Sequence, residues 1–228
     1  MAPALRWLAR RLDLRVAVSA DAMAMAAEAL GGSYVVLNNG VEIDRFVKAS
    51  PWPTVAPTIF FIGRHEDRKG LEVLLEAAQS LPRNVRLWVA GIGPQSEELQ
   101  ARYSHDSRIE WLGQISDEEK AQRMVGADLF CAPSLRGESF GVVLLEAMAA
   151  RTPTVASALP GYSKVARAGQ DALLVEPGDA PALSQAISEV LTSGSLAKEL
   201  VVSGESRANE FSMDRLAERY AELYKTVL

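Results

Sequence analysis

From residue 58 to residue 177, short apolar blocks alternate with segments of helical periodicity. The blocks are apolar on both faces, which is typical of parallel strands covered by helices on either side. Strands are predicted at 58–63, 85–91, 108–113, 127–133, 152–157 and 172–177. Helices are predicted between them, and one follows a capping box that runs from Ser116 to Glu119. This pattern predicts an α/β fold with a Rossmann-like, doubly wound parallel sheet.

The two ends of the chain depart from this alternation. From Asp179 onward the pattern is almost wholly helical, and the last helix has Ser212 as its N-cap. Residues 1–30 contain helix-like segments around one apolar stretch at 15–20. Three prolines within residues 48–57 indicate a linker ahead of the first strand of the sheet.

Composition narrows the classes of function. The net charge of −5 argues against general nucleic-acid binding, which requires a basic surface. Cys131 is the single cysteine, so an internal disulfide is excluded, and we expect it to fill the core. We expect His65 and His105 to be solvated loop residues. No apolar stretch approaches the roughly 20 residues of a membrane span, and the sequence predicts a cytoplasmic protein.

A charged loop follows the predicted strand 58–63, with the sequence Gly63-Arg64-His65-Glu66-Asp67-Arg68-Lys69-Gly70. Arg64 and Lys69 thus stand between a strand and a helix, where doubly wound sheets bind ligands. A helix N-terminus with two cations beside it is a site for an anion such as a pyrophosphate. The alternative is a solvated loop. The flanking glycines and the strand-to-helix position favour phosphate.

Glycines follow the next predicted strand, in the sequence Gly91-Ile92-Gly93-Pro94. Pro94 prevents this from being the full dinucleotide-binding fingerprint. Glycines at this place could let a base or a sugar approach the backbone closely. They could equally form a tight turn, and the sequence leaves both interpretations open.

The segment 137–150, GESFGVVLLEAMAA, holds two carboxylates in an apolar setting. Its helix is predicted to begin near Gly141, so that free backbone N–H groups face the strand ends and favour phosphate. Glu138 would lie in the loop before the helix. Glu146 is more than one turn inside it and could accept hydrogen bonds from the vicinal hydroxyls of a ribose. A helix-capping Glu138 and a salt-bridged Glu146 are the alternatives.

Together these motifs resemble the C-terminal half of retaining glycosyltransferases of the GT-B type, family 4. The resemblance rests on GESFGVVLLEAMAA, on GRHEDRKG at 63–70, on WLGQ at 111–114 and on NNGVEIDRF at 38–46. It covers nearly the whole chain. Within that superfamily the sequence is most similar to the phosphatidyl-myo-inositol mannosyltransferases of actinobacteria, which use GDP-mannose.

The resemblance implies a role for each matching residue. Arg64 and Lys69 would bind the donor diphosphate and stabilise the leaving nucleotide. Glu138, the third residue of the implied catalytic set, would hold sugar hydroxyls, and Glu146 would hold the ribose. The other implied donor-binding residues are Gly63, Gly91, Gln114, Ile115, Ser139, Phe140, Gly141 and Val142. Neither a metal nor another cofactor is implied, and the sequence has no Asp-x-Asp pair of the kind that metal-dependent transferases use.

The resemblance also implies partners and a division of the chain. Residues 1–45 correspond to the tail of the family's N-terminal domain and the crossover, 46–211 to the donor-binding domain, and 212–228 to a helix that packs on the N-terminal domain. We therefore expect a nucleotide-sugar-binding half that is inactive without its acceptor-binding N-terminal domain. Peripheral membrane contact is an expectation for the complete enzyme, whose acceptor would be a lipid or a glycan.

Two other functions fit the same motifs. A nucleotide-sugar-binding module would do no chemistry and would act through a partner chain. A sugar-nucleotide epimerase would share the fold but would need an acidic residue and a histidine placed for proton abstraction, and no such pair is evident in the sequence.

Overall fold

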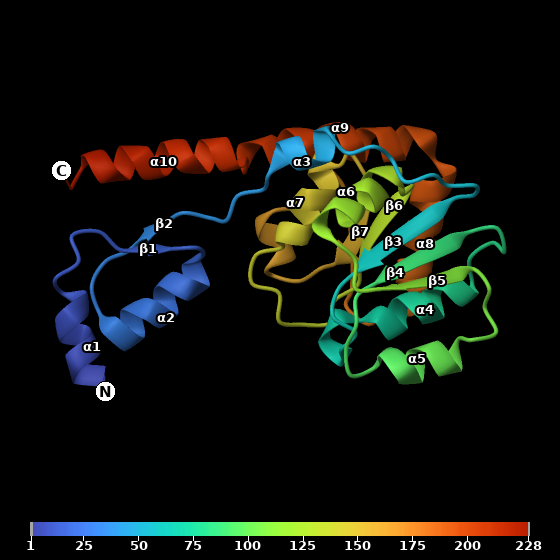
Figure 1. Cartoon of the computed structure of the whole chain (residues 1–228), viewed down its shortest axis with the longest axis horizontal. Helices are drawn as coiled ribbons and strands as arrows, with labels where there is room; N and C mark the ends of the chain where they lie inside the picture. The colour runs from blue at the N-terminus through green and yellow to red at the C-terminus, as the bar shows by residue number, and fades with distance from the viewer. Residues whose placement is uncertain (1, 228) are drawn as a thin grey trace. The chain divides into compact units, whose positions relative to one another are not determined.

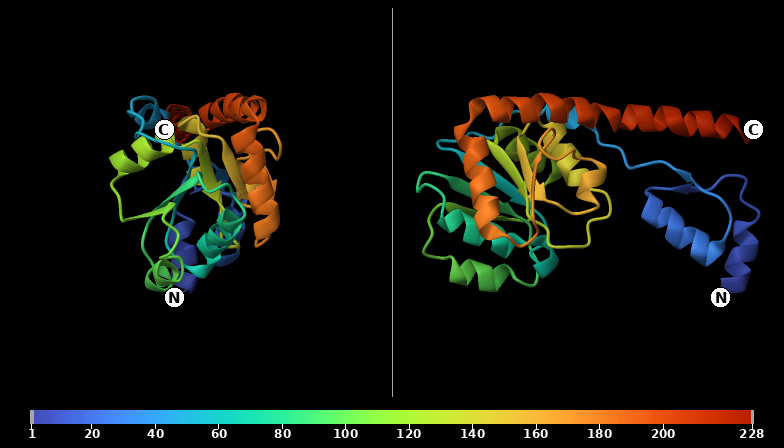
Figure 2. Two further views of the ribbon diagram at one scale, coloured as in Figure 1. Left: turned by 90° about the vertical axis from the view of Figure 1, so that its right-hand side faces the viewer. Right: turned by 180° about the vertical axis from the view of Figure 1, so that it is seen from behind.

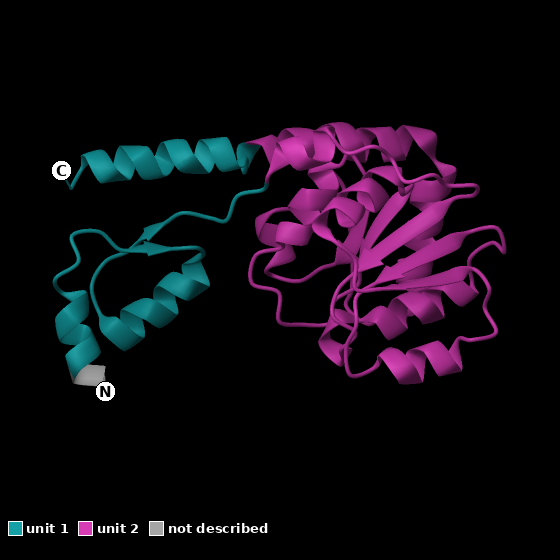
Figure 3. Cartoon of the chain, in the orientation of Figure 1, with its two compact units in different colours: residues 1–41, 210–228 teal, residues 42–209 magenta. Residues whose placement is uncertain are grey.

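The structure is a computed structural model that describes residues 2–227. Its internal contacts define two compact units, shown in Figure 3. The larger unit comprises residues 42–209, and the smaller one joins the residues up to 41 with those from 210 onward. Residues 42–45 therefore belong to the larger unit, and residues 210 and 211 to the smaller one.

The larger unit is an alternation of strands and helices, as the apolar pattern predicts. Its strands are β3 (Thr58–Ile62), β4 (Arg86–Ala90), β5 (Ile109–Gly113), β6 (Leu129–Ala132), β7 (Thr154–Ser157) and β8 (Leu173–Val175). Its α-helices are α3 (Ile43–Val47), α4 (Leu71–Gln79), α5 (Ser96–Arg102), α6 (Asp117–Gly126), α7 (Val142–Ala149), α8 (Ala180–Thr192) and α9 (Gly194–Glu210). Two short 3₁₀ helices are η1 (Asp67–Lys69) and η2 (Tyr162–Lys164). All six predicted strands are confirmed.

The six strands form one parallel sheet in the order β5-β4-β3-β6-β7-β8. The chain builds one half of the sheet outward from β3 and then returns to β6 to build the other. This is the strand order of dinucleotide-binding folds, and its topological switch point lies between β3 and β6. Ligands in such sheets bind outside the carboxyl ends of the strands at that point.

Both faces of the sheet are covered, which explains why the strands are apolar throughout. Ile59 and Phe61 on β3 join a core with α4, α5 and α8. Phe60, between them in sequence, meets Phe130 edge to face on the opposite side, with ring centroids 6.2 Å apart. Helices α3, α6 and α7 lie on that second side (Figures 1 and 2). Cys131 is fully buried in β6, so its prediction as a core residue is confirmed.

Helix ends in the larger unit follow local sequence signals. The Ser116 side chain accepts a hydrogen bond from the Glu119 backbone N–H at the start of α6, which confirms the capping box from the serine side. Helix α7 begins at Val142 with Gly141 as its N-cap residue, as expected.

The smaller unit contains α1 (Ala2–Ala9), β1 (Val16–Ala17), α2 (Ala20–Leu30), β2 (Val35–Val36) and α10 (Met213–Lys225). Strands β1 and β2 form a two-stranded parallel sheet. Ser212 caps α10 by accepting a hydrogen bond from the Arg215 backbone N–H, as the sequence predicts. Among the described residues, no helix combines the length and the apolar character needed to span a bilayer.

A buried ion pair fixes the segment that leads into β5. Arg108 donates to both carboxylate oxygens of Asp106, at 2.9 and 2.6 Å, and the two side chains are only 7% and 3% exposed. Gln79 at the end of α4 donates to the same carboxylate, and Arg108 also reaches the Leu81 carbonyl. The hydrogen bonds from Arg108 hold the pKa of Asp106 well below its usual range.

This pair predicts a pH-dependent loss of stability. A carboxyl group whose pKa is depressed in the folded state stabilises the fold at pH values above its pKa in the unfolded chain, about 3.9. This contribution is lost as the pH falls below that value. Asp106→Asn should cost about 3 kcal/mol at pH 7, because Arg108 stays buried without a counter-charge. Urea unfolding at several pH values measures both effects.

The matched control is Glu189→Gln, which removes a carboxylate from an exposed position of α8. The Asp106→Asn variant should show a shallower decline in unfolding free energy from pH 5 to pH 2 than either the parent chain or the control. Parallel curves for all three proteins would contradict the assignment.

Candidate functional site

The loops that follow β3 and β6 touch each other at the switch point of the sheet. Gly70 ends η1 and has a left-handed backbone with φ 66°. A Cβ atom at Gly70 would stand 1.9 Å from the carbonyl oxygen of Pro133, just beyond β6. The Leu135 backbone N–H donates to the Arg68 carbonyl at 2.8 Å. Only glycine permits both this backbone conformation and this approach.

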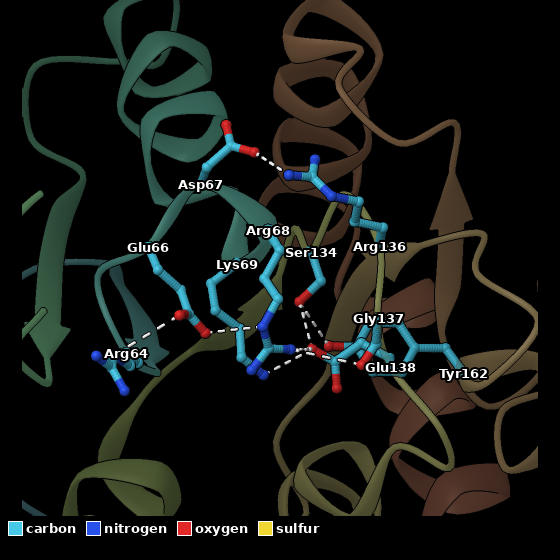
Figure 4. A network of polar contacts seen from close by, with 10 residues as sticks. All are labelled: Arg64, Glu66, Asp67, Arg68, Lys69, Ser134, Arg136, Gly137, Glu138 and Tyr162. Carbon is cyan, nitrogen blue, oxygen red and sulfur yellow. Dashed lines mark hydrogen bonds and ion pairs between the residues drawn. The ribbon is translucent and has the colours of Figure 1, made fainter. Parts of the chain in front are cut away.

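The contact brings a cation and a carboxylate of the predicted site together. Lys69 Nζ donates to Glu138 Oε1 at 2.6 Å, and the two side chains are 21% and 12% exposed. Arg68 adds a second cation, with its Nη1 3.6 Å from the same oxygen. Figure 4 shows Lys69 and Arg68 converging on Glu138 from one loop to the other. An anion at this edge would meet cations that are already held in place.

Two further ion pairs surround this contact. Glu66 lies between Arg68 at 2.8 Å and Arg64 at 3.6 Å. Arg136, on the loop after β6, reaches back to Asp67 at 2.6 Å. Arg64 itself is 65% exposed and does not join Lys69 at Glu138 (Figure 4). Of the two predicted phosphate cations, Lys69 is therefore placed against Glu138, and Arg64 stands at the exposed margin.

Glu146 is paired with a lysine that sequence reasoning missed. Lys120 on α6 donates to Glu146 Oε1 at 2.8 Å, and their side chains are 15% and 18% exposed. The salt-bridged alternative therefore describes this structure correctly. Both side chains are mostly buried where α6 meets α7. The ribose role remains a prediction.

The glycines after β4 pack against the loop after β3. Gly91 has φ 113°, and a Cβ atom there would stand 1.9 Å from the Gly63 carbonyl oxygen. A Cβ atom at Gly93 would stand 2.3 Å from the His65 carbonyl oxygen. Glycine is therefore required at both positions because the two loops at this edge of the sheet are in close contact. That a nucleotide base also approaches Gly91 remains a prediction.

His65 corrects an expectation from the sequence. It is buried, with 1% exposure, and is not solvated. Its Nδ1 lies 2.9 Å from Ser96 Oγ, and that oxygen accepts a hydrogen bond from the Gly93 backbone N–H. Burial lowers the pKa of His65, which favours the neutral imidazole. His105 is exposed, as expected.

The remaining predicted donor-binding residues surround the same edge. Gln114 and Ile115 follow β5, and Gln114 is exposed. The Ser139 carbonyl accepts a hydrogen bond from Lys164 Nζ at 3.3 Å. Phe140 is buried directly before Gly141 and Val142. Within residues 2–227, no three His, Cys, Asp or Glu side chains are grouped as metal ligands would be.

Several residues of the site escaped sequence reasoning. Arg68 and Lys120 carry a positive charge, but so do other residues in the same segments. The sequence alone therefore does not indicate which of these cations lies at the site. The Ser134 hydroxyl contacts Glu138 and also contacts the hydroxyl of Tyr162, which comes from a different segment of the chain. The dipeptide Pro133-Ser134 directly after a strand is the one local signal for Ser134.

The comparison with known families agrees with this geometry. Residues 42–207 match the family described as Glycosyl transferases group 1. The chain belongs to this family. The match covers most of the larger unit, including the loops after β3 and β6.

Two curated relatives come from mycobacteria. The phosphatidyl-myo-inositol mannosyltransferase of Mycobacterium leprae is 36% identical over 220 residues, which cover 93% of this chain and 59% of that protein. The protein of the same name in Mycobacterium tuberculosis is 36% identical over 236 residues, covering 98% and 62%. The chain thus spans about three fifths of the length of these relatives.

Solved structures share the fold. Sucrose-phosphate synthase from Thermosynechococcus elongatus matches with a TM-score of 0.81 and 26% identity, over 97% of this chain and 60% of that one. HepE from Anabaena, solved with UDP and glucose, matches with a TM-score of 0.82 and 21% identity, over 98% and 66%. Both are neighbours of the GT-B type, which confirms the predicted fold class.

The close approach at Gly70 gives a testable prediction. Gly70→Ala should destabilise the chain by about 3 kcal/mol or more, because alanine adds left-handed strain of roughly 1–2 kcal/mol and a clash with Pro133. Gly169→Ala is the matched control, since Gly169 has φ 72° and no atom within 4 Å of an added Cβ. Urea unfolding compares the two variants. Equal losses would show that the loops do not constrain position 70.

Proposed function

We propose that this chain is the donor-binding half of a retaining glycosyltransferase. Its donor is a nucleotide sugar, with GDP-mannose as the first candidate, and its acceptor is a lipid or glycan such as phosphatidyl-myo-inositol. The observation that carries the proposal is the meeting of Lys69 and Glu138, 2.6 Å apart, at the switch point of the sheet. The names of the mycobacterial relatives support mannose, and a lipid acceptor, over other choices.

The first step of the mechanism is donor binding. The diphosphate replaces Glu138 as the ion-pair partner of Lys69 while the carboxylate stays on Ser134, and Arg64 moves in from its exposed position. The backbone N–H groups at the start of α7, from Phe140 to Val142, bind the second phosphate. Both cations then face the charge that develops on the leaving nucleotide. Lys69 and Arg64 therefore act on the bond that breaks.

The second step is sugar transfer. The bond from the anomeric carbon to the phosphate oxygen breaks, and the acceptor hydroxyl forms a new bond to that carbon on the same face. Because the new bond forms on the face that the phosphate leaves, the anomeric configuration is retained. The acceptor proton passes to the departing phosphate oxygen, so the charges balance. Glu138 holds sugar hydroxyls during this step and forms no covalent bond. The base lies near Gly63, Gly91, Gln114 and Ile115.

The rest of the complete enzyme is part of the proposal. The acceptor site belongs to an N-terminal domain, and the mycobacterial relatives are long enough to contain one. In the complete enzyme that domain, with peripheral membrane contact, presents the acceptor to the sugar. We expect the present chain alone to bind the donor without transferring it.

Calorimetric titration with GDP, UDP and ADP tests the donor site. GDP should bind more tightly than UDP or ADP. Lys69→Ala should weaken GDP binding by about tenfold or more, since it removes a charge-assisted hydrogen bond to the phosphate and one of the cations that offset the charge of Glu138. Arg64→Ala should act in the same direction, and guanosine without phosphates should be insensitive to both.

Lys198→Ala and Arg83→Ala are the controls, because both remove an exposed cation of the same unit that lies outside the loops after β3 and β6. If all four variants bind GDP like the parent chain, the cluster is a structural network and the proposed function fails.

The ribose role of Glu146 has its own test. Glu146→Gln should weaken GDP and GDP-mannose binding alike by about tenfold, because both ligands carry the ribose. Binding of 2′,3′-dideoxy-GDP should not change, since that ligand has no vicinal hydroxyls to donate. Glu189→Gln serves as the exposed control. A variant that loses stability but keeps full GDP affinity would leave Glu146 as the ion-pair partner of Lys120 only.

A further inference from the structure

Two buried hydroxyl groups form a hydrogen-bonded chain that ends at the Glu138 carboxylate. Ser134 is 2% exposed and Tyr162 is 1% exposed. Ser134 Oγ stands 3.0 Å from Glu138 Oε1 and 3.0 Å from the Tyr162 hydroxyl. Figure 4 shows the three side chains in sequence, with Lys69 and Arg68 approaching Glu138 from the other loop. Neither hydroxyl faces solvent.

The chemistry of these groups fixes the direction of the hydrogen bonds. A serine hydroxyl has one proton, and Ser134 donates it to the carboxylate oxygen, which can only accept. Ser134 must therefore accept from Tyr162, whose hydroxyl is the donor of the second bond. Burial raises the pKa of Tyr162 well above its usual value, so the phenol keeps its proton. The chain of donors runs from Tyr162 through Ser134 to Glu138.

The backbone beneath Glu138 is held by the same segment that carries Tyr162. Gly161 approaches so closely that a Cβ atom there would stand 1.9 Å from the Glu138 carbonyl oxygen. The Ser139 carbonyl accepts from Lys164 Nζ, at the end of η2. Ser134 itself follows β6 by two residues. Both ends of the hydroxyl chain are thus anchored on well-packed parts of the larger unit.

The two oxygens of Glu138 are used unequally. Oε1 receives the hydrogen bonds of Lys69 and Ser134 and the nearby charge of Arg68. Across residues 2–227, no side chain or backbone group donates a hydrogen bond to Oε2. Lys69 and Arg68 are cations that a diphosphate would attract, whereas the two hydroxyls are neutral. After a diphosphate binds, the hydroxyls remain the partners that can keep Oε1 in place.

We propose that Ser134 and Tyr162 are positioning residues that hold Oε1 of Glu138 so that Oε2 is left to accept hydrogen bonds from the donor sugar. The sugar-facing part of this inference rests on the proposed function. The positioning itself rests on the hydrogen-bond chain alone. Lys69 and Arg68 carry the charge that attracts the phosphates. The neutral hydroxyl chain of Tyr162 and Ser134, called the relay below, orients Glu138 toward the sugar.

The first experiment needs no ligand. Tyr162→Phe removes only the hydroxyl and keeps the ring in its buried place. A double-mutant cycle with Glu138→Ala, followed by urea unfolding, measures whether the two positions are coupled. The loss caused by Tyr162→Phe should be at least threefold smaller, as a ratio of unfolding constants, when Glu138 is absent. Additive losses would overturn the relay.

The second experiment measures the affinities of GDP and GDP-mannose. Tyr162→Phe should leave the GDP dissociation constant within twofold and lower the preference for GDP-mannose over GDP by three- to tenfold. Ser134→Ala should act in the same direction and more strongly. In the Glu138→Ala background, Tyr162→Phe should no longer change the preference. Tyr103→Phe, at a buried tyrosine of the core, is the control that should change neither affinity.

The outcomes separate the two proposals. If the parent chain binds neither GDP nor GDP-mannose, the proposed function fails together with the sugar-facing part of the inference, and the unfolding cycle alone decides the positioning role. If the parent chain binds both ligands and Tyr162→Phe behaves like Tyr103→Phe, the proposed function stands and the relay is wrong.

Discussion

The contact between Lys69 and Glu138 depends on two backbone segments that nearly touch at the switch point of the sheet. Strands β3 and β6 are parallel neighbours, so the loops that follow their carboxyl ends lie side by side. Gly70 lets the first loop turn with a left-handed residue directly against the Pro133 carbonyl. Without this approach, the cations of one loop and the carboxylate of the other would be separate, solvated charges. The site exists because the backbone is close there.

Four cations and three carboxylates are paired with one another at this edge. Cations from both loops are matched by Glu66, Asp67 and Glu138 in a network that crosses between the loops (Figure 4). The outer pairs that Arg136 and Arg64 make are largely exposed and contribute little to stability. An anion that binds at this edge would compete with Glu138 for cations that the network already holds in place.

Away from the site, the larger unit is secured by desolvated cations. Arg123 on α6 lies over the rings of Trp52 and Trp88, 4.2 and 4.8 Å from their centroids, and pairs with Glu119 at 2.8 Å. Trp52 belongs to the proline-containing linker, which this stacking fastens to the sheet. A cation between two aromatic faces loses hydration, and its electrostatic attraction to the ring quadrupoles offsets that loss. No stripe or spacing in the sequence indicates that these two tryptophans share one partner.

The sequence by itself determined the elements and the order in which they follow each other. Apolar runs such as 58–62 are strands because both faces of a parallel sheet are buried, and Ser116 and Ser212 cap helices through bonds to residues three positions away. These are local effects. Only the tertiary structure decided which charges meet. Lys69 and Glu138 are 69 residues apart, and the same loop offers Arg64 and Arg68 as equally plausible partners. The burial of His65 depends on Ser96, 31 residues away, and the pairing of Glu146 depends on a helix reached through another strand. Pairings of this kind follow from distances between packed backbones, and a linear pattern of residue types does not contain those distances.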